Sequence, residues 1–336
     1  MPQVLQNISL LPFNTMRLDA QAIKFSYITS LADLHDLPSC TQQDYIILGG
    51  GSNMLFTQNP TAWIIKNELK GIELIDETTH HYFVKVGSGE IWHDFVMYCI
   101  KQGYAGLENL ALIPGTVGAA PMQNIGAYGV EVKDVIISVN TFDLASHSFK
   151  SFDTEACGFG YRESIFKRAY KNQLFITDVI FKLDKTPTFH TSYGAIQQEL
   201  AQMQVTELTT KAVAQAVINI RTSKLPDPKQ IGNCGSFFKN PELDTIQYNQ
   251  LKAHFPNIPG YAINDDITKV PAAWLIEQCG WKGYRHLDYG VHIHQPLVLV
   301  NYSKATGSEI LQLSETIIAS VVDKFGISLE REVQVY

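Results

Sequence analysis

The sequence predicts an α+β protein with more than one domain. Short apolar strands that end in glycine turns fill its first half, as in "DYIILGGGSN" and "YFVKVGSGE". Patterns typical of helices and of strands then follow each other through the last third. The chain has 336 residues, which is enough for about two or three domains.

Strands outnumber helices among the elements predicted in the first half. Residues 45–48 are expected to form a buried strand, and residues 174–183 a strand rich in β-branched side chains. Residues 91–103 are expected to form a helix because apolar side chains recur along one face. Gly103 is expected to end this helix, since glycine readily takes the left-handed conformation that follows a helix.

Both types of element are predicted in the second half. Helical patterns cover 195–203, "LTTKAVAQAVINIRTSK", 270–280 and 308–326. Pro226 ends the second of these helices. The segments "QPLVLVN" and "SLEREVQVY" have the patterns of strands. The break in pattern after residue 183 indicates a domain boundary near 184–222.

Composition and charge exclude several classes of protein. The net charge is −7 and the isoelectric point about 5.8, so no broad basic surface for nucleic acid is expected. The five cysteines are scattered and contain no C-x-x-C pair, which fits a reducing cytoplasm. The N-terminus lacks a signal-peptide pattern, and no apolar run approaches the ~20 residues of a membrane span. A cytoplasmic protein without a membrane partner is therefore predicted.

The stretch "GGGSN", Gly49 to Asn53, is the first candidate for ligand binding. Consecutive glycines let backbone N–H groups point at a diphosphate without Cβ obstruction, although a plain tight turn has the same composition. It is not a dinucleotide fingerprint, because Met54 stands where that motif needs glycine. It is not a P-loop either, because no Gly-Lys-Ser/Thr follows.

A second glycine-rich stretch, "GLENLALIPGTVGAAPMQNIGAYG", covers residues 106–129. It is too rich in glycine for a helix and, after Glu108, almost without charge. Such a segment is best explained as backbone that lies against a flat, partly apolar ligand. Two such loops in one α+β domain suggest a dinucleotide held without a Rossmann unit.

Six motifs in order extend this interpretation. They are "ILGGGSNMLF", "LIPGTVGAAPMQNIGAYG", "GFGYRESIFK", "RTSKLPDP", "GNCGSFFKNP" and "SLEREV". Together they resemble the UDP-N-acetylenolpyruvoylglucosamine reductases, flavoenzymes of peptidoglycan synthesis, from about Asn14 to Val333. The resemblance implies a two-lobed FAD-binding domain of the vanillyl-alcohol-oxidase (PCMH) type and a separate α+β substrate-binding domain. The loop "FHTSYGAIQQEL" with Tyr193 is similar to the family's type I branch.

The resemblance also implies boundaries. The FAD-binding domain would cover 15–185, with its lobes split near 60–70. A tyrosine loop and connecting helix would cover 186–222, and the substrate-binding domain 223–326. Residues 327–336 would form a C-terminal strand that returns to the active site.

The same resemblance assigns binding residues. FAD would contact Gly49, Gly50, Gly51, Ser52, Asn53, Pro114, Gly115, Gly118, Asn124, Gly126 and Ala127. Binding would be non-covalent, because relatives with this fold often attach flavin to a histidine just after the first glycines, where Ser52 and Asn53 stand here. The UDP-sugar substrate would contact Tyr128, Tyr193, Lys224, Asn240 and Gln295, and NADPH would be the co-substrate. A monomer is expected.

The implied reaction defines what the catalytic residues must do. Hydride adds to the terminal carbon of an enolpyruvyl ether, a proton adds to the carbon that bears the ether oxygen, and negative charge develops on the carboxylate. Arg162 in "GYRES" and Glu332 in "EREV" would stabilise that charge. Glu330 is the structural alternative to Glu332. A hydrogen bond donated by Glu332 would require a pKa raised by burial.

Ser236 in "NCGSFF" would donate the proton. A hydroxyl is a weak acid, but a carbanionic enediolate is a strong base, so a well-placed serine can protonate it. Gly235 and Phe237 are expected to hold it in a dry pocket. A turn serine is the alternative interpretation. A serine hydrolase is not favoured, because no G-x-S-x-G surrounds Ser236.

Other functions would make different demands on the sequence. No metal is expected, because His292 and His294 would share a strand face but lack a third ligand. An oxidase with the same flavin fold would differ by the rapid reaction of the reduced enzyme with oxygen. A non-enzymatic flavin or nucleotide-sugar binding protein would have no need for a proton donor such as Ser236.

Overall fold

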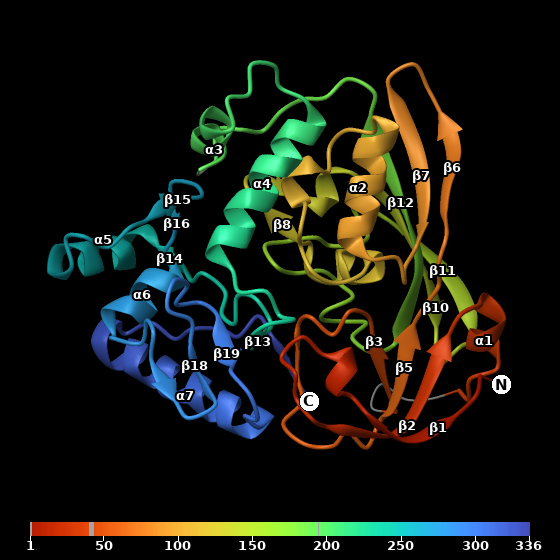
Figure 1. The fold of residues 1–336 in the computed structure, drawn as a ribbon, viewed down its shortest axis with the longest axis horizontal. Coiled ribbons are helices and arrows are strands. Elements are labelled where there is room, and N and C mark those ends of the chain that lie inside the picture. Colours follow the sequence, from red (N-terminus) through yellow and green to blue (C-terminus); the bar gives the residue numbers. More distant parts are fainter. Residues whose placement is uncertain (1, 40–43, 194) are drawn as a thin grey trace. The chain divides into compact units, whose positions relative to one another are not determined.

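The computed structural model describes residues 2–39, 44–193 and 195–336 (Figure 1). The chain forms two compact units, which we call unit 1 and unit 2. Unit 1 comprises Met1–Ile8, Ala22–Gly51 and Thr61–Ser223. Unit 2 comprises Ser9–Gln21, Ser52–Pro60 and Lys224–Tyr336. The chain thus passes from one unit to the other in the middle of the "GGGSN" loop.

The first lobe of unit 1 is a four-stranded sheet in the order β1-β2-β5-β3. Its strands are β1 (Leu5–Ser9), β2 (Gln21–Ile28), β3 (Tyr45–Leu48) and β5 (Trp63–Asn67). Strand β5 lies between β2 and β3 and is parallel to both. Helix α1 (Leu31–His35) follows β2 and begins with a capping box between Ser30 and Asp33. Strand β3 delivers the chain directly to Gly49.

The second lobe of unit 1 is an antiparallel five-stranded sheet in the order β11-β10-β12-β7-β6. Its strands are β6 (Ile72–Glu77), β7 (His81–Gly87), β10 (Ile136–Asp143), β11 (Ser148–Asp153) and β12 (Leu174–Asp184). A small hairpin of β8 (Gly126–Ala127) and β9 (Val130–Glu131) lies within the second glycine-rich stretch. The central strand β12 is apolar at most positions, and its buried side chains Val179 and Phe181 belong to a core that helices share.

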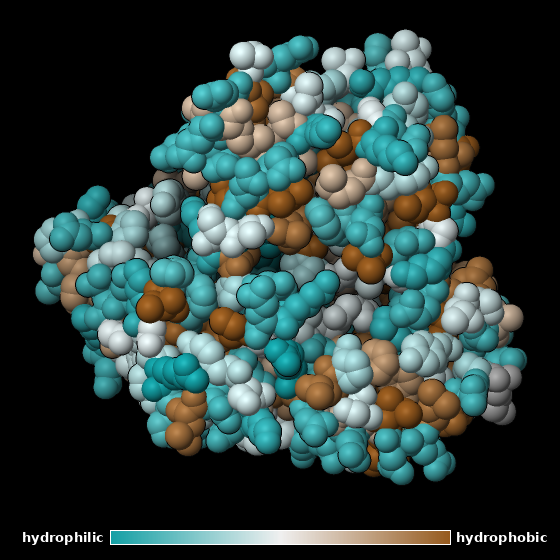
Figure 2. Space-filling model, in the orientation of Figure 1, coloured by the Kyte–Doolittle hydropathy of each residue, from teal (hydrophilic) through white to brown (hydrophobic). Residues whose placement is uncertain are grey.

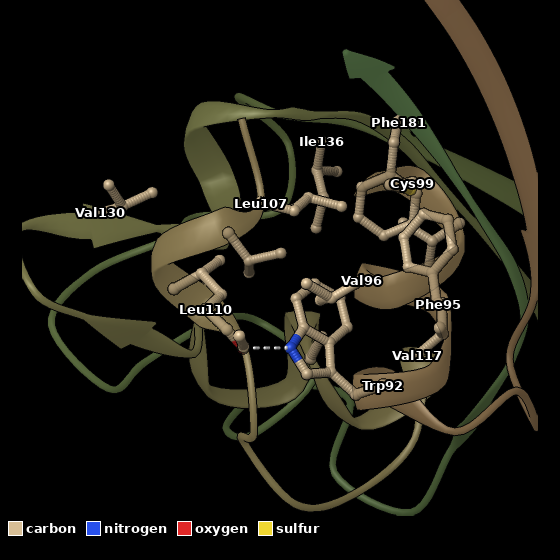
Figure 3. Close-up of a cluster of buried hydrophobic side chains, with 14 of the residues drawn as sticks. Trp92, Phe95, Val96, Cys99, Leu107, Leu110, Val117, Val130, Ile136 and Phe181 are labelled. Carbon is tan, nitrogen blue, oxygen red and sulfur yellow. Dashed lines mark hydrogen bonds between the residues drawn. The ribbon is translucent and has the colours of Figure 1, made fainter. Parts of the chain in front are cut away.

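Helices α2 (Trp92–Gln102), α3 (Ile196–Gln202) and α4 (Thr210–Lys224) share one hydrophobic core with this sheet. Figure 3 shows Trp92 and Phe95 of α2 packed in this core with Phe181 of β12. The Trp92 indole Nε1 donates a 2.9 Å hydrogen bond to the Leu110 carbonyl, which satisfies the buried N–H group. This bond joins α2 to the short 3₁₀ helix η2 (Glu108–Leu110) of the second glycine-rich stretch.

The remaining short helices of unit 1 are η3 (Val117–Ala119), η4 (Pro121–Gln123) and η5 (Val132–Asp134). Helices η3 and η4 stand in place of a long helix because glycines and prolines interrupt the stretch from 106 to 129. Helix α2 ends at Gly103, whose φ of 78° is the left-handed conformation that the sequence predicts there.

Unit 2 contains a four-stranded sheet in the order β13-β19-β18-β17 and a three-stranded sheet in the order β14-β16-β15. Its strands are β13 (Gly232–Asn233), β14 (Glu242–Asp244), β15 (Tyr261–Ala262), β16 (Ile267–Lys269), β17 (Arg285–His286), β18 (Tyr289–Val291) and β19 (Leu299–Asn301). Its helices are η1 (Leu11–Phe13), α5 (Thr245–His254), α6 (Ala272–Gln278) and α7 (Gly307–Phe325). Strand β4 (Met54–Leu55) pairs in parallel with β20 (Gln334–Val335).

Two predicted strands are shorter than their sequence patterns indicate. Only Leu299–Asn301 of "QPLVLVN" and only Gln334–Val335 of "SLEREVQVY" are strands. The alternation in the second segment fails because Glu332 and Val333 are both buried. Backbone bonds to two different partners, Phe237 and Asn53, explain this local irregularity. The other predicted helices and strands described above are confirmed within one to three residues at each end.

Hydrophilic residues dominate the face of the molecule in Figure 2, and apolar residues are interspersed among them. Among the described residues, none of the helices has both the length and the apolar character that crossing a membrane requires.

Candidate active site

The two glycine-rich loops of unit 1 lie in direct contact. A Cβ added at Gly50 would lie 2.9 Å from the Cα of Gly115, and one added at Gly49 would lie 2.7 Å from the Thr116 hydroxyl oxygen. These glycines are therefore required for the close approach of two backbones. Gly118 packs in the same way against Ser88, where its Cβ would lie 2.6 Å from the serine Cβ. The result is a cradle of bare backbone built from both loops, and its glycine composition suits a diphosphate.

The second loop is tied to the turn that carries Arg162. The Asn124 amide nitrogen donates to the Gly160 carbonyl at 3.1 Å and to the Glu131 carboxylate at 3.0 Å, and its oxygen accepts from the backbone N–H of Lys133 at 3.1 Å. Asn124 is fully buried and has a left-handed φ of 44°. Its side chain therefore shapes the loop by contacts within the protein.

Arg162 lies at the tip of a tight turn that Gly160 and Glu163 close through two backbone hydrogen bonds. Its φ is 55°, a strained conformation for a residue with a side chain. One guanidinium nitrogen donates to the Gly126 carbonyl at 2.9 Å. Strain of this kind persists where surrounding bonds enforce it, and it often occurs at functional sites. The turn thus fixes a permanent positive charge beside the glycine loop.

A second arginine increases the positive charge of this region. Arg221 of α4 donates from Nε to the Leu112 carbonyl at 3.2 Å, and its guanidinium hydrogen-bonds the Tyr128 hydroxyl. Burial lowers the pKa of Arg221, and the nearby Arg162 lowers it further. Burial also raises the pKa of Tyr128, so this phenol is neutral. Two guanidinium groups close together indicate a binding site for an anion.

His93 of α2 supports the same loop. Its Nδ1 accepts a 3.0 Å hydrogen bond from the backbone N–H of Leu112, which has a positive φ of 58°. Burial lowers the pKa of His93, and Arg221 lowers it further against the opposing effect of Asp94. A neutral imidazole is needed here, because the protonated ring could not accept this bond.

The two tyrosines predicted to bind substrate meet in unit 1. The Tyr128 and Tyr193 rings lie edge to face with centroids 6.4 Å apart. Tyr128 has a positive φ of 52° and is half-buried, whereas Tyr193 is 60% exposed. The exposed ring of Tyr193 is available to a ligand.

The proposed proton donor lies in unit 2, beside a short antiparallel pairing. The backbone N–H of Glu332 donates to the Phe237 carbonyl at 2.9 Å, and that of Lys239 donates to the Glu330 carbonyl at 2.9 Å. This register puts Ser236 next to the residue that pairs with Glu332. Phe237 is fully buried and anchors the segment.

The structure corrects the prediction of a dry pocket around Ser236. Its side chain is exposed, although Phe237 and Phe238 beside it are buried with rings 5.4 Å apart. Gly235 turns the chain with a φ of 67°, and its N–H donates to the Asn233 side chain at 3.0 Å. These two features direct the hydroxyl away from the core.

The two glutamates of "EREV" have different environments. Glu330 forms a 2.6 Å ion pair with the buried Lys239, and its own side chain is 69% exposed. Glu332 is only 9% exposed. The Asn53 amide donates to the Glu332 carbonyl at 3.2 Å, and the Asn53 carbonyl accepts from the N–H of Gln334 at 3.0 Å. The end of the "GGGSN" loop therefore holds the segment that carries Glu332.

The other predicted substrate residues are placed less centrally. Lys224 is the exposed last residue of α4. The Asn240 oxygen accepts from the N–H of Ala272 at 2.9 Å, at the start of α6. Gln295 is half-buried, and its carbonyl accepts from the N–H of Val298. Pro114 is exposed, and Gly51, with a φ of 62°, is buried.

Comparison with known proteins decides the family. The chain is 49% identical over 333 residues to the UDP-N-acetylenolpyruvoylglucosamine reductase of Amoebophilus asiaticus, and the match covers 98% of each chain. The chain belongs to this family of reductases. The homologous reductase of Flavobacterium johnsoniae is 48% identical, with 99% of each chain covered. Residues 227–336 match the C-terminal domain of the reductase family, and residues 28–146 match an FAD-binding domain.

A solved structure has the same fold as this reductase family member. The UDP-N-acetylenolpyruvylglucosamine reductase of Thermus caldophilus is 21% identical, with a TM-score of 0.69 over the whole of both chains. The predicted fold class, with its two-lobed FAD-binding domain, is confirmed. Both glycine-rich loops lie within the residues that match the FAD-binding domain, and the glycine composition of the first loop suits a diphosphate.

Sequence analysis did not single out two residues that organise this reductase site. The sequence predicts only that Arg221 and His93 belong to helices. Both lie on helices whose patterns indicate core packing, and both reach the loop at Leu112. The sequence carried no signal for this shared contact, because Leu112 is far from Arg221 along the chain.

Proposed function

We propose that the protein reduces UDP-N-acetylglucosamine enolpyruvate to UDP-N-acetylmuramate with NADPH, as a cytoplasmic enzyme of peptidoglycan precursor synthesis. The supporting observation is the antiparallel pairing of 237–239 with 330–332, which holds the segment that carries Ser236 beside the segment that carries the buried Glu332 in a member of the reductase family. The monomeric state stays a prediction.

The chain's own residues would first hold the ligands. The glycine loop of residues 49–51 and the facing residues 115–116 would bind the FAD diphosphate, because the N–H groups of Val117 and Gly118 already donate to the Glu90 and Ser88 carbonyls. Bound FAD supplies the hydride that the reaction needs. Tyr193, Lys224, Asn240 and Gln295 would contact the UDP-sugar, with Tyr128 on the glycine loop. Because the oxygen of Asn240 already accepts a helix N–H, its amide nitrogen is the end we assign to the ligand.

Arg162 would act on the developing charge. When hydride adds to the terminal carbon, negative charge spreads into the substrate carboxylate. A guanidinium already fixed by the Gly126 carbonyl and a strained turn needs little reorganisation to stabilise that charge. Glu332 would assist by hydrogen bonding to the same carboxylate, since its side chain is buried where that of Glu330 is exposed.

Ser236 would complete the reaction. Its hydroxyl proton moves to the carbon that bears the ether oxygen, and the serine oxygen then recovers a proton from water. The exposure of Ser236 favours this last step, because solvent reaches the hydroxyl. Its location after the left-handed Gly235 lets the hydroxyl project from the anchored Phe237.

Anaerobic half-reactions test this proposal. The protein with FAD is mixed with NADPH, flavin absorbance is followed, and UDP-N-acetylglucosamine enolpyruvate is then added. We expect bleaching by NADPH and rapid recovery of the absorbance by the substrate. If the substrate does not reoxidise the reduced flavin but oxygen reoxidises it rapidly, the protein would instead be an oxidase. A yellow protein that NADPH does not bleach would support a binding role only.

Variants of the second half-reaction identify the residues. Ser236→Ala should keep the rate of flavin reduction by NADPH and lose substrate reduction by roughly 10²–10⁴-fold, the usual contribution of general acid catalysis. Glu332→Gln should also impair only the second half-reaction. Glu330→Gln is the matched control and should leave both rates close to wild type, because the Glu330 side chain is 69% exposed and a glutamine oxygen can still accept a hydrogen bond from Lys239. Equal turnover in Ser236→Ala would refute the proton-donor role.

A further inference from the structure

A single buried side chain joins the two tyrosine segments of unit 1. The Asn109 amide nitrogen donates to the Tyr128 carbonyl at 3.0 Å and to the His190 carbonyl at 2.7 Å. Asn109 is 1% exposed. An amide nitrogen carries two hydrogens, and each of them is directed at a different loop. His190 is three residues before Tyr193 in a segment without regular secondary structure.

The base of this contact is rigid. Asn109 lies in η2, next to Leu110, whose carbonyl accepts the indole hydrogen bond of the fully buried Trp92 (Figure 3). On its other side, the Glu108 carboxylate accepts from the N–H of Gly106 at 2.9 Å. Helix α2 and the core therefore hold Asn109 in place, while the tyrosine segment depends on side-chain contacts of this kind.

The contact also bears on the geometry of both rings. Tyr128 has a left-handed backbone with a φ of 52°, and its carbonyl is one of the two acceptors. Gly129 follows it with a φ of 83°, and a Cβ there would lie 3.6 Å from the Tyr193 Cβ. The edge-to-face arrangement of Tyr128 and Tyr193 is thus set by two backbones that Asn109 joins.

We propose that Asn109 is a positioning residue for substrate binding, which holds the Tyr193 loop against the Tyr128 turn in the arrangement that binds the UDP-sugar. This inference rests on the proposed function for the role of Tyr193. A loop held in its binding position loses less conformational entropy when the ligand binds, so the affinity is higher. Asn109 itself need not touch the substrate.

The test uses Asn109→Leu in the FAD-loaded protein, with Asn109→Ser measured alongside in case the leucine variant folds poorly. The matched control is Asn14→Leu. Asn14 is also buried, at 5% exposure, and its amide nitrogen also donates to two backbone carbonyls, those of Leu10 and Leu18, within unit 2. Loss of ordinary stability should therefore affect both variants alike.

The first readout is chymotrypsin cleavage after Phe189 and Tyr193 under native conditions, located by mass spectrometry. The cleavage rate is proportional to the population of the locally open loop, provided that the loop closes faster than the protease cuts it. We expect roughly tenfold faster cleavage at these sites in Asn109→Leu, the change expected for loss of one or two hydrogen bonds. Asn14→Leu should cleave there at the wild-type rate. Equal cleavage in wild type and Asn109→Leu would overturn the inference.

The second readout is the KM for UDP-N-acetylglucosamine enolpyruvate. We expect a rise of roughly tenfold in Asn109→Leu, with flavin reduction by NADPH within about twofold of wild type. In the double variant with Tyr193→Phe, the increase in KM should be smaller than the product of the two single increases, because both substitutions act on the same loop. Faster cleavage without a change in KM would also overturn the inference. Failure of the proposed function can be distinguished from failure of this inference, because in that case the wild-type protein itself would not turn over the substrate.

Discussion

The contact between the two glycine loops makes a quantitative prediction at Gly50. In Gly50→Ala the new Cβ would lie 2.9 Å from the Gly115 Cα and 3.3 Å from the Gly115 carbonyl carbon. Ordinary carbon contacts need about 3.5–4.0 Å, so the loops must separate by roughly 0.6–1 Å. Overpacking of this size costs about 1–3 kcal/mol. A backbone atom is the obstacle, so no side-chain rotation relieves it.

This energy divides between two measurable quantities. If the loops separate in the protein without FAD, FAD must close them again and its Kd rises. If they remain close, the unfolding free energy of the FAD-free protein falls. We expect the two losses to sum to about 1–3 kcal/mol, equivalent to a Kd increase of about 5- to 150-fold if all of it appears in binding. Flavin fluorescence titration measures the Kd for FAD, and urea unfolding measures the unfolding free energy of the FAD-free protein.

Gly103→Ala is the control for this prediction. Gly103 has a φ of 78°, and a Cβ there would meet nothing within 4 Å. Alanine should therefore lower the unfolding free energy by about 1–2 kcal/mol through backbone strain, without a change in the Kd for FAD. A Gly50→Ala protein with wild-type FAD affinity and wild-type stability would refute the loop contact.

Two pH-dependent predictions follow from charged groups in unit 1. Burial opposes ionisation of Asp143, but Lys150 and two backbone N–H groups lower its pKa from 3.8 to about 2. The ionised carboxylate therefore stabilises the fold above pH 3.8, and this stabilisation is lost as the pH falls towards 2. Asp143→Asn should therefore lower the unfolding free energy by roughly 2–3 kcal/mol at pH 7 and by much less at pH 2.5, and equal differences at both values would contradict this assignment. Burial lowers the pKa of His93. Below pH 6.5 the histidine is therefore protonated more readily in the unfolded chain than in the folded chain, so the free energy of unfolding decreases as the pH falls below 6.5. In urea unfolding at pH 7.5 and pH 5, wild type should lose more stability than His93→Asn, and parallel losses would show that His93 is not the group responsible.

Elements with local signals were predictable from the sequence. Helix α2 ends at Gly103 and α7 ends at Gly326, both in the left-handed conformation that glycine favours. Strand β12 was recognised from its β-branched residues. Each of these signals lies within a few residues of the element it determines, so the surrounding fold is not needed to interpret it.

Features that depend on distant partners were not predictable. The exposure of Ser236 follows from the pairing of its neighbours with residues about 95 positions later, which no local pattern encodes. The alternation of "SLEREVQVY" predicted one strand, but Glu332 and Gln334 bond to different segments. Asn109 illustrates the same limit, since one of its acceptors is 81 residues away.

The pairing of β20 with β4 has a consequence for the order in which the protein forms. Met54 and Leu55 are synthesised early, but their partners Gln334 and Val335 leave the ribosome 280 residues later. During synthesis unit 1 has all of its segments once Ser223 has emerged, whereas unit 2 must wait with Ser9–Gln21 and Ser52–Pro60 unpaired. Strand β4 therefore acquires its partner only after the sheets and helices of unit 2 that precede β20 have been synthesised.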